Sequence, residues 1–150
     1  MTNKALISKS FGLYGISDVA KYLKVTFPHA DDLNISTSKL RYWIQSGASH
    51  ISDPQFPTSR RLVAFQDVIS MRMIAILRAK GIPLSKIRDM ETWMRRQYQT
   101  DWPFAFRPMW TYQSDVIIEF ERQLVAATSA GQIVMEFIRE WLVLVHAGID

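Results

Sequence analysis

The chain has 150 residues, of which 48% are hydrophobic and none is cysteine. This length fits one domain, or one small domain with an appended segment, and the composition excludes a mostly disordered chain. The lack of cysteine excludes disulfides and thiolate metal sites. No apolar run approaches the roughly 20 residues that span a bilayer, and residues 1–10 lack the apolar core of a signal peptide. We therefore expect a cytoplasmic protein that does not bind membranes.

The charge of the chain is unevenly distributed. Residues 1–100 carry 15 basic and seven acidic residues, a net charge of +8, whereas residues 101–150 carry three and seven, a net charge of −4. A basic segment favours a polyanionic partner, because lysine and arginine at a phosphate backbone release condensed counterions. An ordinary solvated surface is the alternative. The asymmetry suggests that the two parts have different roles.

The first predicted element is a helix from Gly15 to Lys24. Its apolar residues recur at intervals of three and four, the period of one helix face; they are Ile16, Val19, Ala20 and Leu23. Residues 25–34 include Pro28 among turn-forming residues, so they are predicted to form a loop.

A second helix is predicted to begin between Ile35 and Ser38. Ser36 or Thr37 caps its first turn, and the serine and glycine at 46–47 end it. Its apolar stripe consists of Leu40, Trp43 and Ile44.

A short strand and two longer helices are predicted next. The strand covers residues 61–65, and a helix follows from Asp67 to Lys80. Pro83 stands at the start of the next helix, Leu84 to Tyr98. The inward-facing residues of these helices are predicted to be Val68, Ile69, Met71 or Arg72, Met73, Ala75, Ile76, Leu77, Ile87, Met90, Trp93 and Met94.

The pattern changes after residues 101–103, Asp-Trp-Pro. An aromatic segment, 104–112, precedes two predicted strands at 116–120 and 124–127. Residues 129–145 are predicted to form a final helix, because their apolar residues follow a helical period. The predicted fold is therefore mostly α with small β: four helices and a wing in residues 1–100, followed by a small β-β-α tail in residues 101–150.

The second helix and the following strand together suit the binding of duplex DNA. Lys39 and Arg41 project outward while Leu40 faces the core, and such a helix fits the major groove. Arg60 and Arg61 adjoin the short strand, where they can reach phosphates or the minor groove.

Three segments resemble the DNA-binding domain of the MerR family of winged-helix regulators. They read ISDVAKYLKV, STSKLRYWIQSG and SRRLVAFQDVISMRMIAILRAKGIPLSKI, and they span about residues 14–90. The resemblance implies a winged helix-turn-helix and a transcriptional regulator that binds double-stranded DNA. Its implied contacts come from the recognition helix and from the wing. We expect these DNA-binding residues to be Ser36, Thr37, Lys39, Arg41, Tyr42, Arg60 and Arg61; Tyr42 is equally well explained as half-buried core.

The chain departs from the MerR pattern in three places. The connection between the first two helices is longer than the usual turn, and Ala64 occupies a position that is often aromatic. The long dimerising helix is missing, because Pro103 ends the fourth helix early. We expect a homodimer, and the remaining candidates for its interface are residues 104–112 and the final helix, whose apolar stripe is wide. The alternative is that this stripe packs on the fourth helix and buries Trp93 and Met94.

The tail, with WTYQSDVIIEF and RQLVAATSAGQIVMEFI, weakly resembles MerR-like antitoxins of bacterial toxin–antitoxin pairs. This implies an autoregulating repressor that binds a cognate toxin through residues 101–150. Two alternatives are a plain regulator without a toxin and an excisionase-like protein that bends DNA.

The sequence does not predict an enzyme, a cofactor or a metal site. His29, His50 and His146 are not at metal-ligand spacing, and the hydroxyl groups have no neighbouring base. Asp31 and Asp32 lie among turn formers, which favours turn capping over acid–base chemistry. Trp43, Trp93 and Trp141 fall on apolar stripes and are predicted to be core residues rather than base-stacking residues.

Overall fold

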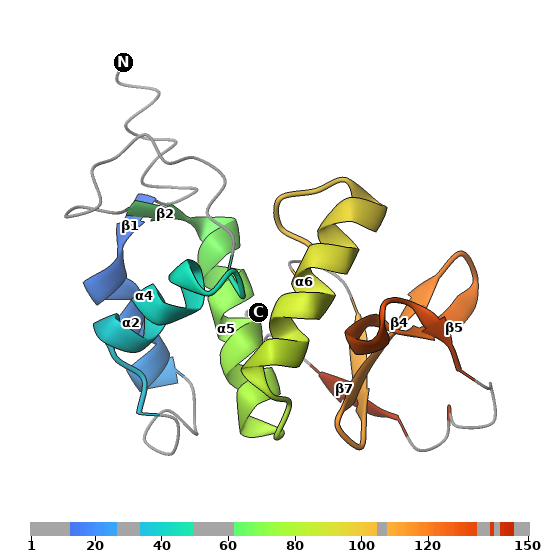
Figure 1. Cartoon of the computed structure of the whole chain (residues 1–150). Helices are drawn as coiled ribbons and strands as arrows, with labels where there is room; N and C mark the ends of the chain where they lie inside the picture. The colour runs from blue at the N-terminus through green and yellow to red at the C-terminus, as the bar shows by residue number, and fades with distance from the viewer. Residues whose placement is uncertain are drawn as a thin grey trace.

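The computed structural model describes residues 13–26, 34–49, 62–104, 108–134, 139 and 142–145. The elements follow in the order β1 (Leu13–Gly15), α2 (Ile16–Thr26), α4 (Thr37–Gln45), β2 (Leu62–Ala64), α5 (Phe65–Ala79), α6 (Leu84–Tyr98), β3 (Met109–Tyr112), β4 (Asp115–Phe120), β5 (Gln123–Ala126), the 3-10 turn η2 (Ala127–Ser129), β6 (Gln132–Ile133) and β7 (Val143–Val145). Helices α2 and α4 lie on one side of α5, and α6 lies between α5 and the C-terminal strands (Figure 1).

The predicted elements of the first hundred residues are confirmed with small shifts. The apolar stripe of α2 is buried as predicted, through Ile16, Val19, Ala20 and Leu23. In α4, Leu40 and Trp43 are buried, while Ile44 packs at the edge of the core. Gly47, with φ +86°, adopts the left-handed conformation that commonly follows a helix end.

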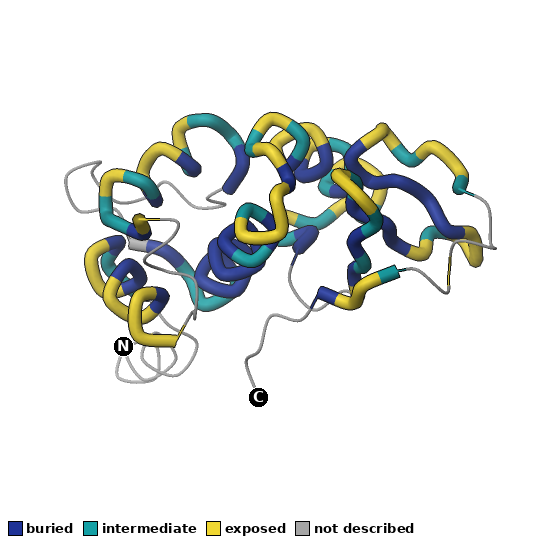
Figure 2. The backbone as a smooth tube through the Cα atoms, turned by 90° about the horizontal axis from the view of Figure 1, so that it is seen from below, coloured by how far each residue is buried: buried dark blue, intermediate teal, exposed yellow. Residues whose placement is uncertain are grey.

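Helix α5 begins two residues earlier than predicted, at Phe65, because Asp67 acts from inside the first turn. The Asp67 carboxylate accepts a hydrogen bond from the backbone N–H of Ala64 at 2.9 Å, which ties the end of β2 to the helix start. The helix is buried over nearly its whole length, from Asp67 to Ala75, and its trace is dark blue in Figure 2. It forms the centre of the protein.

Helix α6 occupies the predicted residues, Leu84–Tyr98, and its N-cap residue is Pro83. It ends at Gln99, whose left-handed φ of 51° terminates the helix four residues before Pro103. The helix end is therefore set by local backbone conformation, and Pro103 is not the residue that stops it.

The predicted small β-β-α tail is wrong, and so is the fold class of a mostly α protein. The C-terminal part is a five-stranded antiparallel sheet in the order β6-β5-β4-β3-β7. Strands β4 and β5 confirm the two predicted strands, and β3 forms the last part of the aromatic segment, 104–112. The predicted helix over 129–145 is contradicted at both ends, because residues 132–133 and 143–145 are strands.

Backbone conformation and strand pairing explain why this helix does not form. Ala130 and Gly131 both have left-handed φ angles, of 54° and 79°, which interrupt a helix immediately after η2. Val145 pairs with Met109, so the apolar run at 143–145 lies beside β3. The spacing of apolar residues in 129–145 is compatible with a helix and also with short apolar strands. Only the long-range pairing of strands distinguishes these two structures.

The inner face of the sheet packs against α6. Phe120 of β4 makes edge-to-face contacts with Trp93 and Tyr98, with ring centroids 5.6 and 5.5 Å apart. The Tyr98 hydroxyl donates to the carbonyl of Glu119 at 3.2 Å. Trp93 and Met94 are thus covered within one chain, as the intrachain alternative predicted, but by the sheet and η2 instead of a helix.

A single cluster of buried apolar residues extends from α2 through α5 and α6 to the inner face of the sheet. Trp43 is in this cluster and Trp93 packs against it, which confirms the prediction that both are core residues; Trp141 lies outside the described residues. A second, smaller cluster on the outer face contains Ile117, Leu124 and Ala126. The division at residue 100 stays a prediction. Among the described helices, none has the length and apolar character needed to cross a bilayer.

Gly131→Ala is expected to destabilise the protein more than Gly81→Ala. Both glycines have positive φ, +79° and +89°, so an alanine costs about 1 kcal/mol at either position. A Cβ at Gly131 would also lie 2.2 Å from Cζ2 of Trp93, whereas a Cβ at Gly81 meets nothing within 4 Å. Overpacking adds about 1–3 kcal/mol at Gly131. Urea unfolding of both variants measures the difference, and equal losses would contradict the Trp93 contact.

Candidate nucleic-acid interface

Helix α4 separates apolar and polar side chains onto two faces. Leu40 and Trp43 are buried against the core, whereas Arg41 and Tyr42 are exposed. The Tyr42 side chain is 58% exposed, which rules out the half-buried alternative for this residue. The residues of α4 include two basic side chains and no acidic one. The exposed face is therefore polar and carries the positive charge of Arg41, while Lys39 is half-buried.

The first turn of α4 is fixed by Ser36, which was predicted as one of two capping residues. The Ser36 hydroxyl oxygen accepts a hydrogen bond from the backbone N–H of Lys39 at 3.1 Å, and its extended backbone is that of an N-cap residue. The hydroxyl hydrogen is not used in this bond. Ser36 can therefore cap the helix and still donate to an anion, while Thr37 is half-buried beside it.

Of the seven predicted DNA-binding residues, the structure describes five, and all five lie at or within α4. Lys39 is half-buried and takes part in an interaction inside the protein, whereas Arg41 is exposed on the same helix. Arg60 and Arg61 lie outside the described residues, as do the three histidines and the Asp31–Asp32 pair. The structure therefore places five of the predicted residues together at α4 and does not describe the two arginines of the predicted wing.

The base of the predicted wing is a two-stranded ladder. Strand β1 pairs with β2 in antiparallel register, with Tyr14 opposite Val63. The chain leads from β2 directly into α5 without an intervening loop. Strand β2 is therefore held between β1 and the first turn of α5.

Helix α2 is held in place by an arginine from α5. Buried Arg72 donates to the Thr26 hydroxyl at 2.9 Å and to the Thr26 carbonyl at 3.4 Å. A cation at the C-terminus of a helix satisfies its last carbonyls and the negative end of its dipole. Because α2 also contacts α4, this bond stabilises the helix on which α4 rests.

Two exposed lysines on α2 were not among the residues predicted to bind DNA. Lys21 and Lys24 both lie outside the buried stripe of this helix. Their spacing relative to the apolar residues Val19, Ala20 and Leu23 places both lysines on the outward face of the helix. The sequence alone could therefore have predicted their exposure. Each adds an exposed positive charge to the helix that contacts α4.

Asp67 connects the wing strand to the segment that precedes the sheet. One carboxylate oxygen accepts the Ala64 N–H, and the other accepts the indole N–H of Trp102 at 2.9 Å. Burial raises the pKa of Asp67, and the hydrogen bonds from Ala64 and Trp102 oppose this effect. The carboxylate is therefore held by two donors from segments far apart in the chain.

A second buried carboxylate lies in α6. Glu91 accepts a hydrogen bond from Nε of Arg95 at 2.9 Å, one helical turn away. Burial raises the pKa of Glu91, and the Arg95 guanidinium opposes this effect. The Arg95 guanidinium thus balances the charge of the buried Glu91 carboxylate. We interpret the pair as a structural ion pair.

Within the described part of the chain, no three His, Asp or Glu side chains are grouped to hold a metal ion. Comparison of the whole chain with protein-family models, curated proteins and solved structures finds no match.

Trp102→Phe is expected to cost about 1.5–3 kcal/mol of stability at neutral pH, because it removes a donor from a buried carboxylate. The pKa of Asp67 is higher in the folded protein than in the unfolded chain. The free energy of unfolding therefore falls as pH rises from the unfolded pKa to the folded pKa. Loss of the indole raises the folded pKa of Asp67 further. The loss of unfolding free energy in the variant, relative to wild type, therefore grows with pH. It is smallest in acid, where Asp67 is protonated.

Urea unfolding of wild type and variant across this pH range measures the effect. Trp93→Phe is the control, because its ring contact with Phe120 does not depend on the charge of Asp67. A Trp102→Phe deficit that is the same at all pH values would show that only packing is lost.

Proposed function

We propose that this protein is a transcriptional regulator, of the MerR-like winged-helix type, that binds double-stranded DNA in a sequence-specific manner in the cytoplasm. The observation that carries the proposal is the division of α4 between a buried stripe and an exposed basic face. A helix with this division enters the major groove without disturbing its own packing. The proposed roles do not include catalysis or a cofactor.

The contacts are expected to divide into two classes. Arg41 and Tyr42 project from the exposed face of α4, where side chains reach base edges. Ser36 stands at the helix start, where N–H groups and hydroxyls bind phosphates. Lys21 and Lys24 on the adjacent helix are further candidates for the DNA backbone.

The sheet is the proposed site of dimerisation. Two exposed apolar side chains, Val143 and Leu144, are 51% and 52% exposed on edge strand β7. No other described strand pairs with β7 besides β3, and an edge strand of this kind can pair with a strand of another chain. Antiparallel pairing of this edge with a second copy has two-fold symmetry, which suits two DNA half-sites.

An antitoxin role is the second candidate. It is favoured by the charge of residues 101–150, which is −4, because an acidic surface suits a basic toxin. If the sheet binds such a partner, the apolar edge at Ile133, 62% exposed on β6, is available besides β7. Co-expression with the product of the neighbouring gene, followed by co-purification, tests this role.

Affinity for duplex DNA is expected to fall steeply with salt. Each phosphate neutralised by lysine or arginine contributes about 0.9 to the slope of log affinity against log salt concentration. Fluorescence anisotropy with labelled duplexes at several salt concentrations measures this slope. An affinity independent of salt, or no binding to any duplex, would contradict the proposed function.

Arg41→Ala is expected to weaken binding to the preferred duplex by about 1–3 kcal/mol and to relax base preference. Arg96→Ala is the matched control, because Arg96 is an exposed arginine on α6, away from α4. It removes the same charge and is expected to change affinity little. Selection of preferred duplexes by both variants measures preference; unchanged preference in a folded Arg41→Ala protein would contradict the placement of the recognition helix.

Leu144→Lys is expected to convert the dimer to monomer in the full-length chain, because it places a charge at the open edge of β7. Val25→Lys is the control: Val25 is 86% exposed on α2, far from the sheet. Sedimentation velocity at micromolar concentration separates the two species. The full chain is the appropriate sample, because removing residues after Tyr98 would uncover Trp93 on α6. A wild-type protein that is already monomeric would contradict dimerisation through the sheet.

A further inference from the structure

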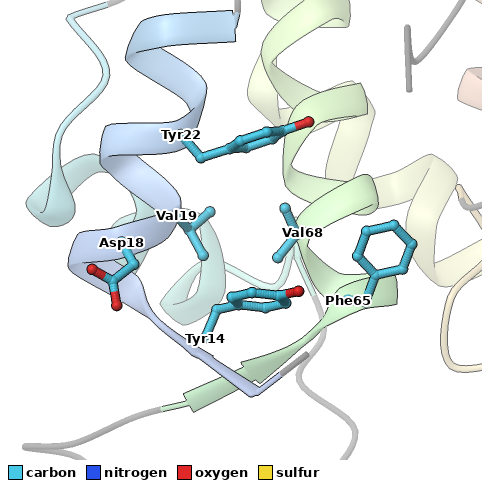
Figure 3. Close-up of a pocket in the computed structure, with 6 residues that line it drawn as sticks. All are labelled: Tyr14, Asp18, Val19, Tyr22, Phe65 and Val68. Carbon is cyan, nitrogen blue, oxygen red and sulfur yellow. The ribbon is translucent and has the colours of Figure 1, made fainter. Parts of the chain in front are cut away.

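A small pocket lies between α2 and the first turn of α5. Its volume is about 160 Å³. It is lined by Tyr14, Asp18, Val19, Tyr22, Phe65 and Val68 (Figure 3). None of these residues was among the predicted DNA contacts, and the pocket is separate from the exposed face of α4.

Aromatic rings form most of the wall. The rings of Tyr14 and Tyr22 lie one above the other in Figure 3, both seen nearly edge-on, with Val19 and Val68 between them. The planes of the two rings are therefore roughly parallel in this view. Phe65 contributes a third ring from the start of α5.

The charge of the lining points to the class of ligand. The face of an aromatic ring carries partial negative charge and attracts cations. The one charged residue among the six that line the pocket is Asp18, which is exposed and whose carboxylate is directed away from the two tyrosine rings in Figure 3. None of these six described residues is a lysine, an arginine or a histidine. We propose that this pocket is a binding site for a small organic cation, whose ammonium group lies between the two tyrosine rings.

The size of the pocket limits the ligand. An engineered protein cavity of about 150 Å³ holds one benzene molecule, so a pocket of this volume accepts a quaternary ammonium group or a single ring. A nucleotide or a peptide segment is too large. Val19 and Val68 at the floor are buried and offer only methyl groups, which suits the methyl groups of a trimethylammonium.

Choline and its neutral isostere 3,3-dimethylbutan-1-ol form the probe pair. They have the same shape and differ in the charge of one central atom. Isothermal titration calorimetry of the full-length protein, without DNA, is expected to detect choline and to give an affinity at least about 10-fold weaker for the alcohol. Because DNA is absent, the result tests the pocket independently of the proposed function.

Three variants localise the binding. Tyr22→Leu removes one ring face and is expected to weaken choline binding by about 5- to 30-fold, whereas Tyr22→Phe keeps the ring and the affinity. Asp18→Asn is expected to weaken choline less than Tyr22→Leu does, because the exposed carboxylate is directed away from the rings, and to leave the alcohol unchanged. Asp89→Asn, at an exposed carboxylate of α6, is the matched control and is expected to change neither.

Three outcomes would overturn the proposal. The first is that choline does not bind at millimolar concentration. The second is equal affinity for choline and the alcohol, which would make the pocket a neutral apolar site. The third is binding that Tyr22→Leu does not weaken in a protein whose thermal unfolding shows that it is folded, which would place the ligand elsewhere.

Discussion

Helix α6 has to be covered on two sides, and the rest of the fold depends on this requirement. One side buries Ile87, Met90 and Met94 in the core shared with α5. The other carries Trp93 and Tyr98, whose rings are too large to leave in water without loss of burial energy. Phe120 from the sheet contacts both rings. The sheet is thus the second wall of the same core, and it cannot be treated as a detachable addition.

Polar contacts set the register of this packing at both ends of α6. Near its start, Lys86 donates to the carbonyl of Ser114 at 3.2 Å and lies 3.5 Å from the Asp115 carboxylate. Near its end, Tyr98 reaches the backbone of β4. Asp115 also accepts a bond from Thr128 at 2.6 Å, so the same carboxylate joins β4 to η2. The ion pair is partly exposed and contributes little energy by itself; its effect is to specify position.

Local signals allowed the first hundred residues to be predicted well. Pro83 and Gly47 mark helix boundaries through their own backbone preferences, so α6 and the end of α4 were placed correctly. Asp67 was read as the start of a helix, but its carboxylate caps from the third position. The tail was mispredicted because residues 133–145 fit a helical period, while the pairing of Val145 with Met109 depends on residues 36 positions apart.

The α4 face and the aromatic pocket also differ in how far the sequence predicts them. The α4 face was predictable, because the burial of Leu40 and Trp43 fixes the direction of Arg41 and Tyr42. The aromatic pocket was not, because its walls come from β1, α2 and α5, and no short motif contains all three. Tyr22 alone looks like an ordinary surface residue. Only the antiparallel pairing of β1 with β2 brings Tyr14 and Phe65 to the same place.

The bond from Arg72 to the end of α2 has a consequence for how the chain tolerates insertions. In a short helix-turn-helix, the turn itself sets the angle between the two helices, so insertions there are costly. Here the α5 arginine anchors Thr26, the last residue of α2, directly to the centre of the protein. Doubling the length of a flexible connection costs only about 0.6 kcal/mol of closure entropy. A change in the length of the connection between α2 and α4 is therefore expected to leave α2 in place on α5, provided that Arg72 and Thr26 are kept.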